Sequence, residues 1–170
     1  MADWHDENTM SQKVMDYWHH DVFEGNYHYV WDYTILGSGE SMTLVIVTPE
    51  GPARAHLTIM VMSSAELTAS LLKGVSVEAN GTEFTIPNRD HASTNTLATK
   101  LYHTPTNPTG GTSVGRVKVG AGRSVGGDAQ DSQWMILAPS TTYTLTMENE
   151  ANGDNTITYN VNLVERAPLG

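Results

Sequence analysis

The clearest pattern in the chain is an alternation of apolar and polar residues on both sides of Asn80-Gly81. The alternation runs over residues 75–79 and again over residues 82–86. Asn-Gly is the preferred two-residue type I′ turn, because both of its residues take positive φ. Such a turn would place Val75 opposite Ile86 and gather the apolar side chains on one face. The sequence therefore predicts a β-hairpin that ends at the proline after the second run.

The same two-residue period recurs along residues 27–166 in eight to ten short segments separated by turn signals. The segments with the best alternation are 29–35, 42–46, 57–61, 67–71, 134–137, 143–147 and 157–163. Residues 104–130 are rich in Gly, Pro, Ser and Thr, and the pattern predicts loops there around a short strand at 117–119. Residues 143–147 and 157–163 are predicted as a last pair of strands with one buried and one wet face. The whole pattern predicts a single all-β domain, an antiparallel β-sandwich or jelly roll.

An aromatic strip lies in the first of these strands, where Tyr29, Trp31 and Tyr33 alternate with polar residues. Aromatic residues favour strands and bury large areas, so core packing is the preferred interpretation. A protein interface and a sugar-stacking platform remain as alternatives.

The first 26 residues fall outside the β pattern and are interpreted as an N-terminal arm, while residues 167–170 form a short tail. Thr9 followed by Gln12 resembles a capping box, and apolar residues at helical spacing predict a short helix over about 10–20. An isolated helix of this length is marginal in water, so the arm is expected to dock on its own sandwich or on a partner. The arm supplies six candidate interface residues: Trp4, Met10, Val14, Tyr17, Trp18 and Phe23.

Composition narrows the classes of function. The 170 residues carry a formal net charge of −10, and residues 1–50 hold nine carboxylates but only Lys13. An acidic chain repels phosphate groups, so nucleic acid is not expected as a partner. The chain has no cysteine and its apolar runs are too short to cross a bilayer, so a cytoplasmic site of folding and no membrane partner are expected.

Candidate chemical motifs are weak. The run 122–126 matches the G-x-S-x-G nucleophile elbow, but no helical pattern follows it, as that turn requires. Histidines beside carboxylates, at His5 and at His19-His20, lack the spacing that places zinc ligands on one face. We therefore expect no catalytic residue, no metal and no cofactor.

The order of several motifs resembles a family of virion proteins. These motifs are LLKGVSVEANGTEFTIPNRDHASTNT, the T-P-T of 104–106, the glycine-rich GAGRSVGG, and WMILAPSTTYTLTMENEANGDNTITYNVNLVE. Over residues 57–165 the chain resembles the small head decoration, or cement, proteins of tailed phages. It departs from the family where Arg89-Asp90-His91 replaces a more basic loop, and where the last strand ends in Val164-Glu165 rather than an aromatic residue.

The resemblance implies a jelly-roll domain on the outer surface of a phage head, assembled in the host cytoplasm. The implied role is to stabilise the shell by bridging capsomers as a dimer or trimer, so the partners are the major capsid protein and the chain itself. Arg89 and His91, in the loop after Pro87, join the arm residues as candidate contacts. A tail or fibre adaptor and a carbohydrate-binding β-sandwich, which would use Tyr29, Trp31 and Tyr33, are the alternatives.

Overall fold

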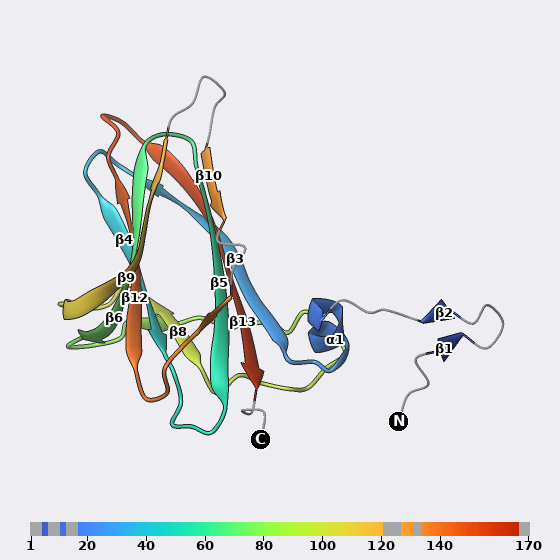
Figure 1. Ribbon diagram of the computed structural model, residues 1–170. Coiled ribbons are helices and arrows are strands. Elements are labelled where there is room, and N and C mark those ends of the chain that lie inside the picture. The colour runs from blue at the N-terminus through green and yellow to red at the C-terminus, as the bar shows by residue number, and fades with distance from the viewer. Residues whose placement is uncertain (1–4, 7–10, 13–16, 121–126, 131–133, 167–170) are drawn as a thin grey trace.

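The computed structural model describes residues 5–6, 11–12, 17–120, 127–130 and 134–166. The elements are β1 (His5–Asp6), β2 (Ser11–Gln12), α1 (Tyr17–Phe23), β3 (Tyr27–Leu36), β4 (Ser41–Val47), β5 (Arg54–Ser63), β6 (Leu67–Ser76), β7 (Thr82–Glu83), β8 (Lys100–His103), β9 (Thr109–Val119), β10 (Gly127–Gln130), β11 (Met135–Ile136), β12 (Thr142–Asn149) and β13 (Asn155–Arg166). Two antiparallel sheets pack face to face (Figure 1), which confirms the predicted all-β sandwich.

The two sheets differ in width. The four-stranded sheet has the order β10-β5-β13-β3, with β11 also paired to β5, and the six-stranded sheet has the order β7-β8-β4-β12-β6-β9. The short α1 lies beside the four-stranded sheet, on the side that faces away from the six-stranded sheet (Figure 1). The strands β1 and β2 pair with each other and lie beyond α1.

Four of the strand pairs are nested in the sequence. The innermost pair is β6 with β9, and outside it come β5 with β10, β4 with β12, and β3 with β13. Successive strands β3, β4, β5 and β6 alternate between the sheets, and so do β9, β10, β12 and β13, while β11 stays in the sheet of β10. The four nested pairs therefore join the two halves of the chain within both sheets.

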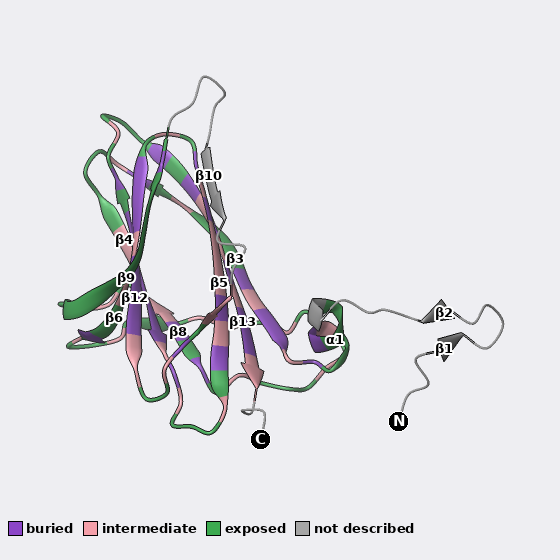
Figure 2. Cartoon of the chain, in the orientation of Figure 1, coloured by how far each residue is buried: buried purple, intermediate pink, exposed green. Residues whose placement is uncertain are grey.

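The core lies between the sheets and is formed by the inward residues of each strand (Figure 2). Its central members are Leu44, Ile46, Leu57, Leu67, Leu101, Leu145, Met147, Ile157, Tyr159, Val161 and Leu163. All of them are nearly inaccessible to solvent, as the two-residue period of strands with one buried face requires.

The hairpin predicted around Asn80-Gly81 is wrong. Val75 pairs with Gly110 of β9 rather than with Ile86, and the second run pairs with β8 through β7. Gly81 has φ +96°, and a Cβ there would lie 2.0 Å from the carbonyl oxygen of His103. This glycine therefore serves a close approach of two backbones instead of a type I′ turn.

The loop predicted over residues 104–130 is wrong in part. The short strand predicted at 117–119 is the end of β9, an 11-residue edge strand over residues 109–119 whose side chains are exposed up to the last position. The two last strands do not pair either, because β12 lies in the six-stranded sheet and β13 in the four-stranded one. Their apolar residues meet across the core.

The helix of the arm begins later than expected. Ser11 and Gln12, placed in the helix by sequence spacing, form β2 and pair with Asp6 and His5. The helix itself is α1, seven residues from Tyr17 to Phe23. Gly25 stops the helix just after its last residue: its φ is +68°, and its N–H donates to the carbonyl of Val22.

Candidate functional site

The aromatic strip of β3 faces solvent instead of the core. Trp31 and Tyr33 are each 65% exposed and Ile35 is 58% exposed, whereas Val30 and Leu36 of the same strand are buried. The preferred core interpretation of Trp31 and Tyr33 is therefore wrong. Exposing large apolar side chains in a row is unfavourable unless something covers them, so the row is a candidate contact surface.

Two neighbouring strands extend this surface into what we call the aromatic face. It consists of Tyr29, Trp31, Tyr33 and Ile35 of β3, Thr158, Asn160 and Asn162 of β13, and Met60 and Met62 of β5. None of these nine side chains is charged. Aromatic residues and methionine are enriched, and charges depleted, at the centres of protein interfaces.

The polar row in the middle of the aromatic face is incompletely hydrogen-bonded. Asn160 lies opposite Trp31, and Asn162 lies opposite Tyr29. The amide of Asn162 donates to Thr58 at 3.1 Å, but the Oδ1 atoms of Asn160 and Asn162 accept no hydrogen bond from the described residues and are shielded from solvent. A buried acceptor without a donor is costly, so these two amide oxygens lower the stability of the sheet.

One end of the aromatic face is closed by α1. Asp21 of the helix is 1% exposed and forms an ion pair with Arg166, at the end of β13. Burial raises the pKa of the Asp21 carboxyl to about 6, which is still below neutral pH, so the carboxylate is charged when it pairs with the guanidinium. This pair fixes the arm helix to the sheet.

The loop after Pro87 holds the same end from the edge of β3. Asn88 donates its side-chain amide to the carbonyl of Gly25 at 2.7 Å, and Asn95 donates to the carbonyl of Glu24 at 3.0 Å. His28 is 3% exposed, and its ring nitrogens lie 3.1 Å from the carbonyl oxygen of Asn95 and 3.3 Å from that of Asn26. The loop is therefore attached to the end of α1 and to the start of β3.

Arg89, one of the two loop candidates, lies beside the aromatic face. Its guanidinium carbon is 5.1 Å from the ring centre of Tyr27 and 5.9 Å from that of Tyr29. The cation–π contact orders Tyr29 at the margin of the face. His91, the other loop candidate, is exposed farther along the loop.

The arm candidates divide into three groups. Phe23 is 73% exposed at the end of α1, next to the aromatic face. Tyr17 and Trp18 lie in the first turn of α1, but their side chains are not described. Trp4, Met10 and Val14 lie outside the described residues. The structure thus brings Phe23 and Arg89 to one end of the same surface.

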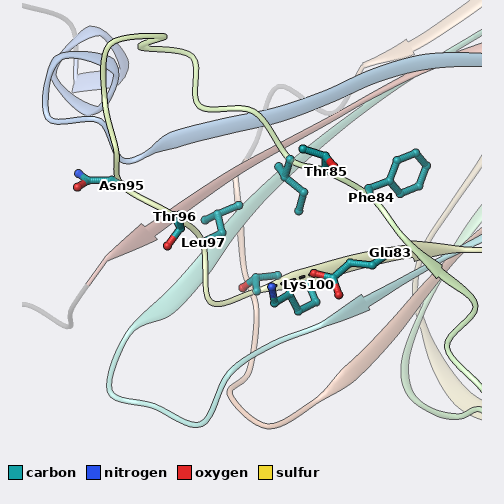
Figure 3. A pocket seen from close by; sticks show the side chains of 9 residues that line it. Glu83, Phe84, Thr85, Asn95, Thr96, Leu97 and Lys100 are labelled. Carbon is teal, nitrogen blue, oxygen red and sulfur yellow. Dashed lines mark ion pairs between the residues drawn. The ribbon is translucent and has the colours of Figure 1, made fainter.

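A cavity of about 340 Å³ lies between residues 83–86 and 95–100 (Figure 3). Its two charged residues, Glu83 and Lys100, are joined by an ion pair of 2.8 Å. A neutralised, half-exposed pair leaves neither a free base nor a free acid for catalysis. This cavity therefore gives no support to an enzymatic function.

Metal and membrane functions find no support in the described residues. No group of three or more His, Asp or Glu side chains among them is placed to hold a metal ion. Among the described residues, no helix is long and apolar enough to cross a bilayer, and α1 has only seven residues.

No protein-family model, no curated protein and no solved structure matches this chain. The assignment of a function therefore depends on the chain's own surface. Sequence reasoning identified Tyr29, Trp31 and Tyr33 as a unit but missed Ile35, Met60, Met62 and the asparagines of β13. The signal for the asparagines was available, because Asn160 and Asn162 alternate with buried apolar residues and so had to lie on the outward face.

Proposed function

We propose that this chain is a non-enzymatic decoration protein of a tailed-phage head, a jelly roll that docks on the outside of the shell through its aromatic face. The observation that carries the proposal is the row of Trp31, Tyr33 and Ile35, each more than half exposed on an uncharged sheet face. Such residues are the usual anchors of protein interfaces, where a few aromatic side chains supply most of the binding free energy.

The nested strand pairs support the jelly-roll part of the proposal. A rolled antiparallel hairpin with two Greek keys is the arrangement that defines this architecture. The order of the motifs in residues 57–165 resembles that of phage decoration proteins, and a rolled sandwich is the fold that this resemblance implies.

A shell-stabilising role fits the chemistry of the surface. The aromatic face has no charge, so its burial against a shell costs no ion desolvation. An interface of standard size buries about 1,600 Å², and many equivalent copies add their contributions over a shell. The chain would act by adding contact area, without a chemical step.

Labelling of intact particles tests the proposal and separates it from a tail role. An antibody against this chain should mark the whole head of the phage that encodes it. Labelling confined to one vertex or to the tail would support an adaptor in its place, and unlabelled particles that contain the other virion proteins would contradict both.

A carbohydrate-binding function is the second candidate, and the exposure of Trp31 and Tyr33 favours it. Aromatic rings on an open sheet can stack on sugar rings, and Trp31 and Tyr33 are both exposed on such a sheet. A glycan array together with titration of the tryptophan fluorescence tests it. Binding to a glycan that is lost in Trp31→Ala would establish this function, and absence of any hit would remove it.

A further inference from the structure

A second surface lies on the opposite edge of the sandwich, where the two sheets fail to close. It is a groove of about 670 Å³ between β11 on one side and β6, β9 and β12 on the other. Its floor and walls are apolar, with Leu71, Val114, Met135, Ile136 and Tyr143 among the lining residues. The volume lies in the range of ligand sites, about 300–1,000 Å³.

The local strand geometry explains why the groove is open. β9 is the last strand of the six-stranded sheet, and its register with β6 shifts between Leu71 and Leu72, next to Val114. The two-residue β11 covers only a short part of the opposite side. Ile136 therefore remains 58% exposed and Val114 46% exposed at the rim.

The groove is also positively charged. Arg54 and Lys73 line it, neither forms an ion pair with a described residue, and no carboxylate occurs among the described lining residues. Two unpaired cations over an apolar floor, in a chain with a net charge of −10, select an acidic and apolar occupant.

The arm of this chain has that chemistry. Residues 1–16 contain four carboxylates and one lysine, together with Trp4, Met10, Val14 and Met15. The described arm residues are extended, since His5 and Asp6 pair with Gln12 and Ser11. An extended segment can lay its apolar side chains in a groove between free strand edges while its backbone pairs with one of them.

We propose that the groove binds the acidic arm, residues 1–16, of a second copy of this chain. A second copy is preferred to the chain's own arm because β1 and β2 lie beyond α1 on the side of β3 (Figure 1), whereas β11 and β9 border the groove at the other side of the sandwich. An arm that leaves one edge and enters the opposite edge of a neighbour makes a head-to-tail contact, which gives a ring where the rotation between copies closes and a filament where it does not. The contact does not depend on what the aromatic face binds.

Charge reversal on both sides of the contact tests the proposal with full-length chains. The groove variant is Arg54→Glu/Lys73→Glu, the arm variant is Asp3→Lys/Asp6→Lys/Glu7→Lys, and self-association is measured by sedimentation velocity over a concentration series. Each variant alone should lose self-association by tenfold or more in the dissociation constant, because like charges then meet in the groove. A one-to-one mixture should recover it, because each arm finds an oppositely charged groove on the other variant.

The matched control is Arg116→Glu/Lys100→Glu, which changes the net charge as much as the groove variant but lies outside the groove lining. It should associate like the unmodified chain. Two results would overturn the proposal: a groove variant that associates as well as the control, or a mixture that stays dissociated. The chain's own arm would be the occupant under two conditions. The mixture stays dissociated, and a single chain that carries the groove and the arm substitutions together regains the thermal stability that each variant loses alone.

Discussion

The two outer faces of the sandwich have opposite characters, although the same nested strand pairs build both. On the six-stranded sheet, polar groups are paired within the chain: the hydroxyls of Thr43 and Thr146 lie 3.0 Å apart, and Lys118 forms an ion pair of 2.6 Å with Glu150. On the four-stranded sheet, Trp31 and Tyr33 face solvent and two asparagine acceptors are unmatched. A face that satisfies itself needs no partner, whereas the aromatic face is energetically incomplete alone.

The largest effect is expected where the chain itself closes the aromatic face. Arg166→Met should lower the free energy of unfolding at neutral pH by about 3–5 kcal/mol, because it leaves the buried Asp21 carboxylate without its cation. Chemical denaturation measures the change. The double variant Arg166→Met/Asp21→Asn is the control, and it should recover most of the loss because no buried charge remains.

The same variant has a signed pH dependence. Burial raises the pKa of Asp21 to about 6, above its unfolded value of 3.8, and Arg166→Met removes the guanidinium that forms an ion pair with the carboxylate. Because the pKa of Asp21 is higher in the folded than in the unfolded state, its contribution to the free energy of unfolding is fully present below the unfolded-state pKa. That contribution is lost as the pH rises through the folded-state pKa. Arg166→Met should therefore be more stable, relative to the unmodified chain, at pH 4 than at pH 7.5, and a pH-independent difference would contradict the pairing.

The next effect concerns the open part of the aromatic face. Trp31→Ala/Tyr33→Ala should weaken binding to undecorated heads by at least about thirtyfold, the equivalent of about 2 kcal/mol for an anchor of an interface. The free energy of unfolding should change by less than about 1 kcal/mol, because both side chains are 65% exposed. Co-sedimentation with heads measures the binding.

Tyr102→Ala is the matched control, since this tyrosine lies on β8 of the six-stranded sheet next to Lys100. It should leave co-sedimentation unchanged. Equal losses from the control and from the aromatic-face variant would mean that the two outer faces do not differ in function.

The smallest effect is expected from the face that satisfies itself. Thr43→Val removes one hydroxyl of the Thr43–Thr146 hydrogen bond and should cost about 0.5–1.5 kcal/mol of unfolding free energy. Binding to heads should not change, which separates stability from docking. Thermal denaturation and co-sedimentation of the same sample provide both readings.

Alternation in the sequence predicted the sandwich because most strands bury one face fully, as in β12, where Tyr143, Leu145 and Met147 are all buried. The same alternation assigned the wrong face of β3 to the core, because Trp31, Tyr33 and Ile35, which belong to the more apolar of its two alternating sets, are exposed. β3 is an edge strand, and its inward set includes His28 and Asp32, so hydrophobicity alone assigned the inside to the wrong residues.

Pairing was less predictable than the strands themselves. Asn80-Gly81 favours a local hairpin, but β6 gains a much longer ladder with β9, which competes with that turn. The first eight residues of β9, 109–116, escaped detection because their side chains are exposed on both faces, so no alternation marks them and their Gly and Thr content is typical of a loop. The aromatic face and the groove depend on these long-range pairings, which is why neither could be derived from local patterns.

Oxidative footprinting of Trp31 tests the central claim most directly, because it compares one side chain in free and head-bound protein. Mass spectrometry of the peptide that contains Trp31 reports its oxidation, and Tyr102 of β8, in the six-stranded sheet, is the internal reference. The account predicts that Trp31 is strongly protected on heads while Tyr102 is unchanged. Equal oxidation of Trp31 in the free and the bound protein would show that the aromatic face is not the docking surface.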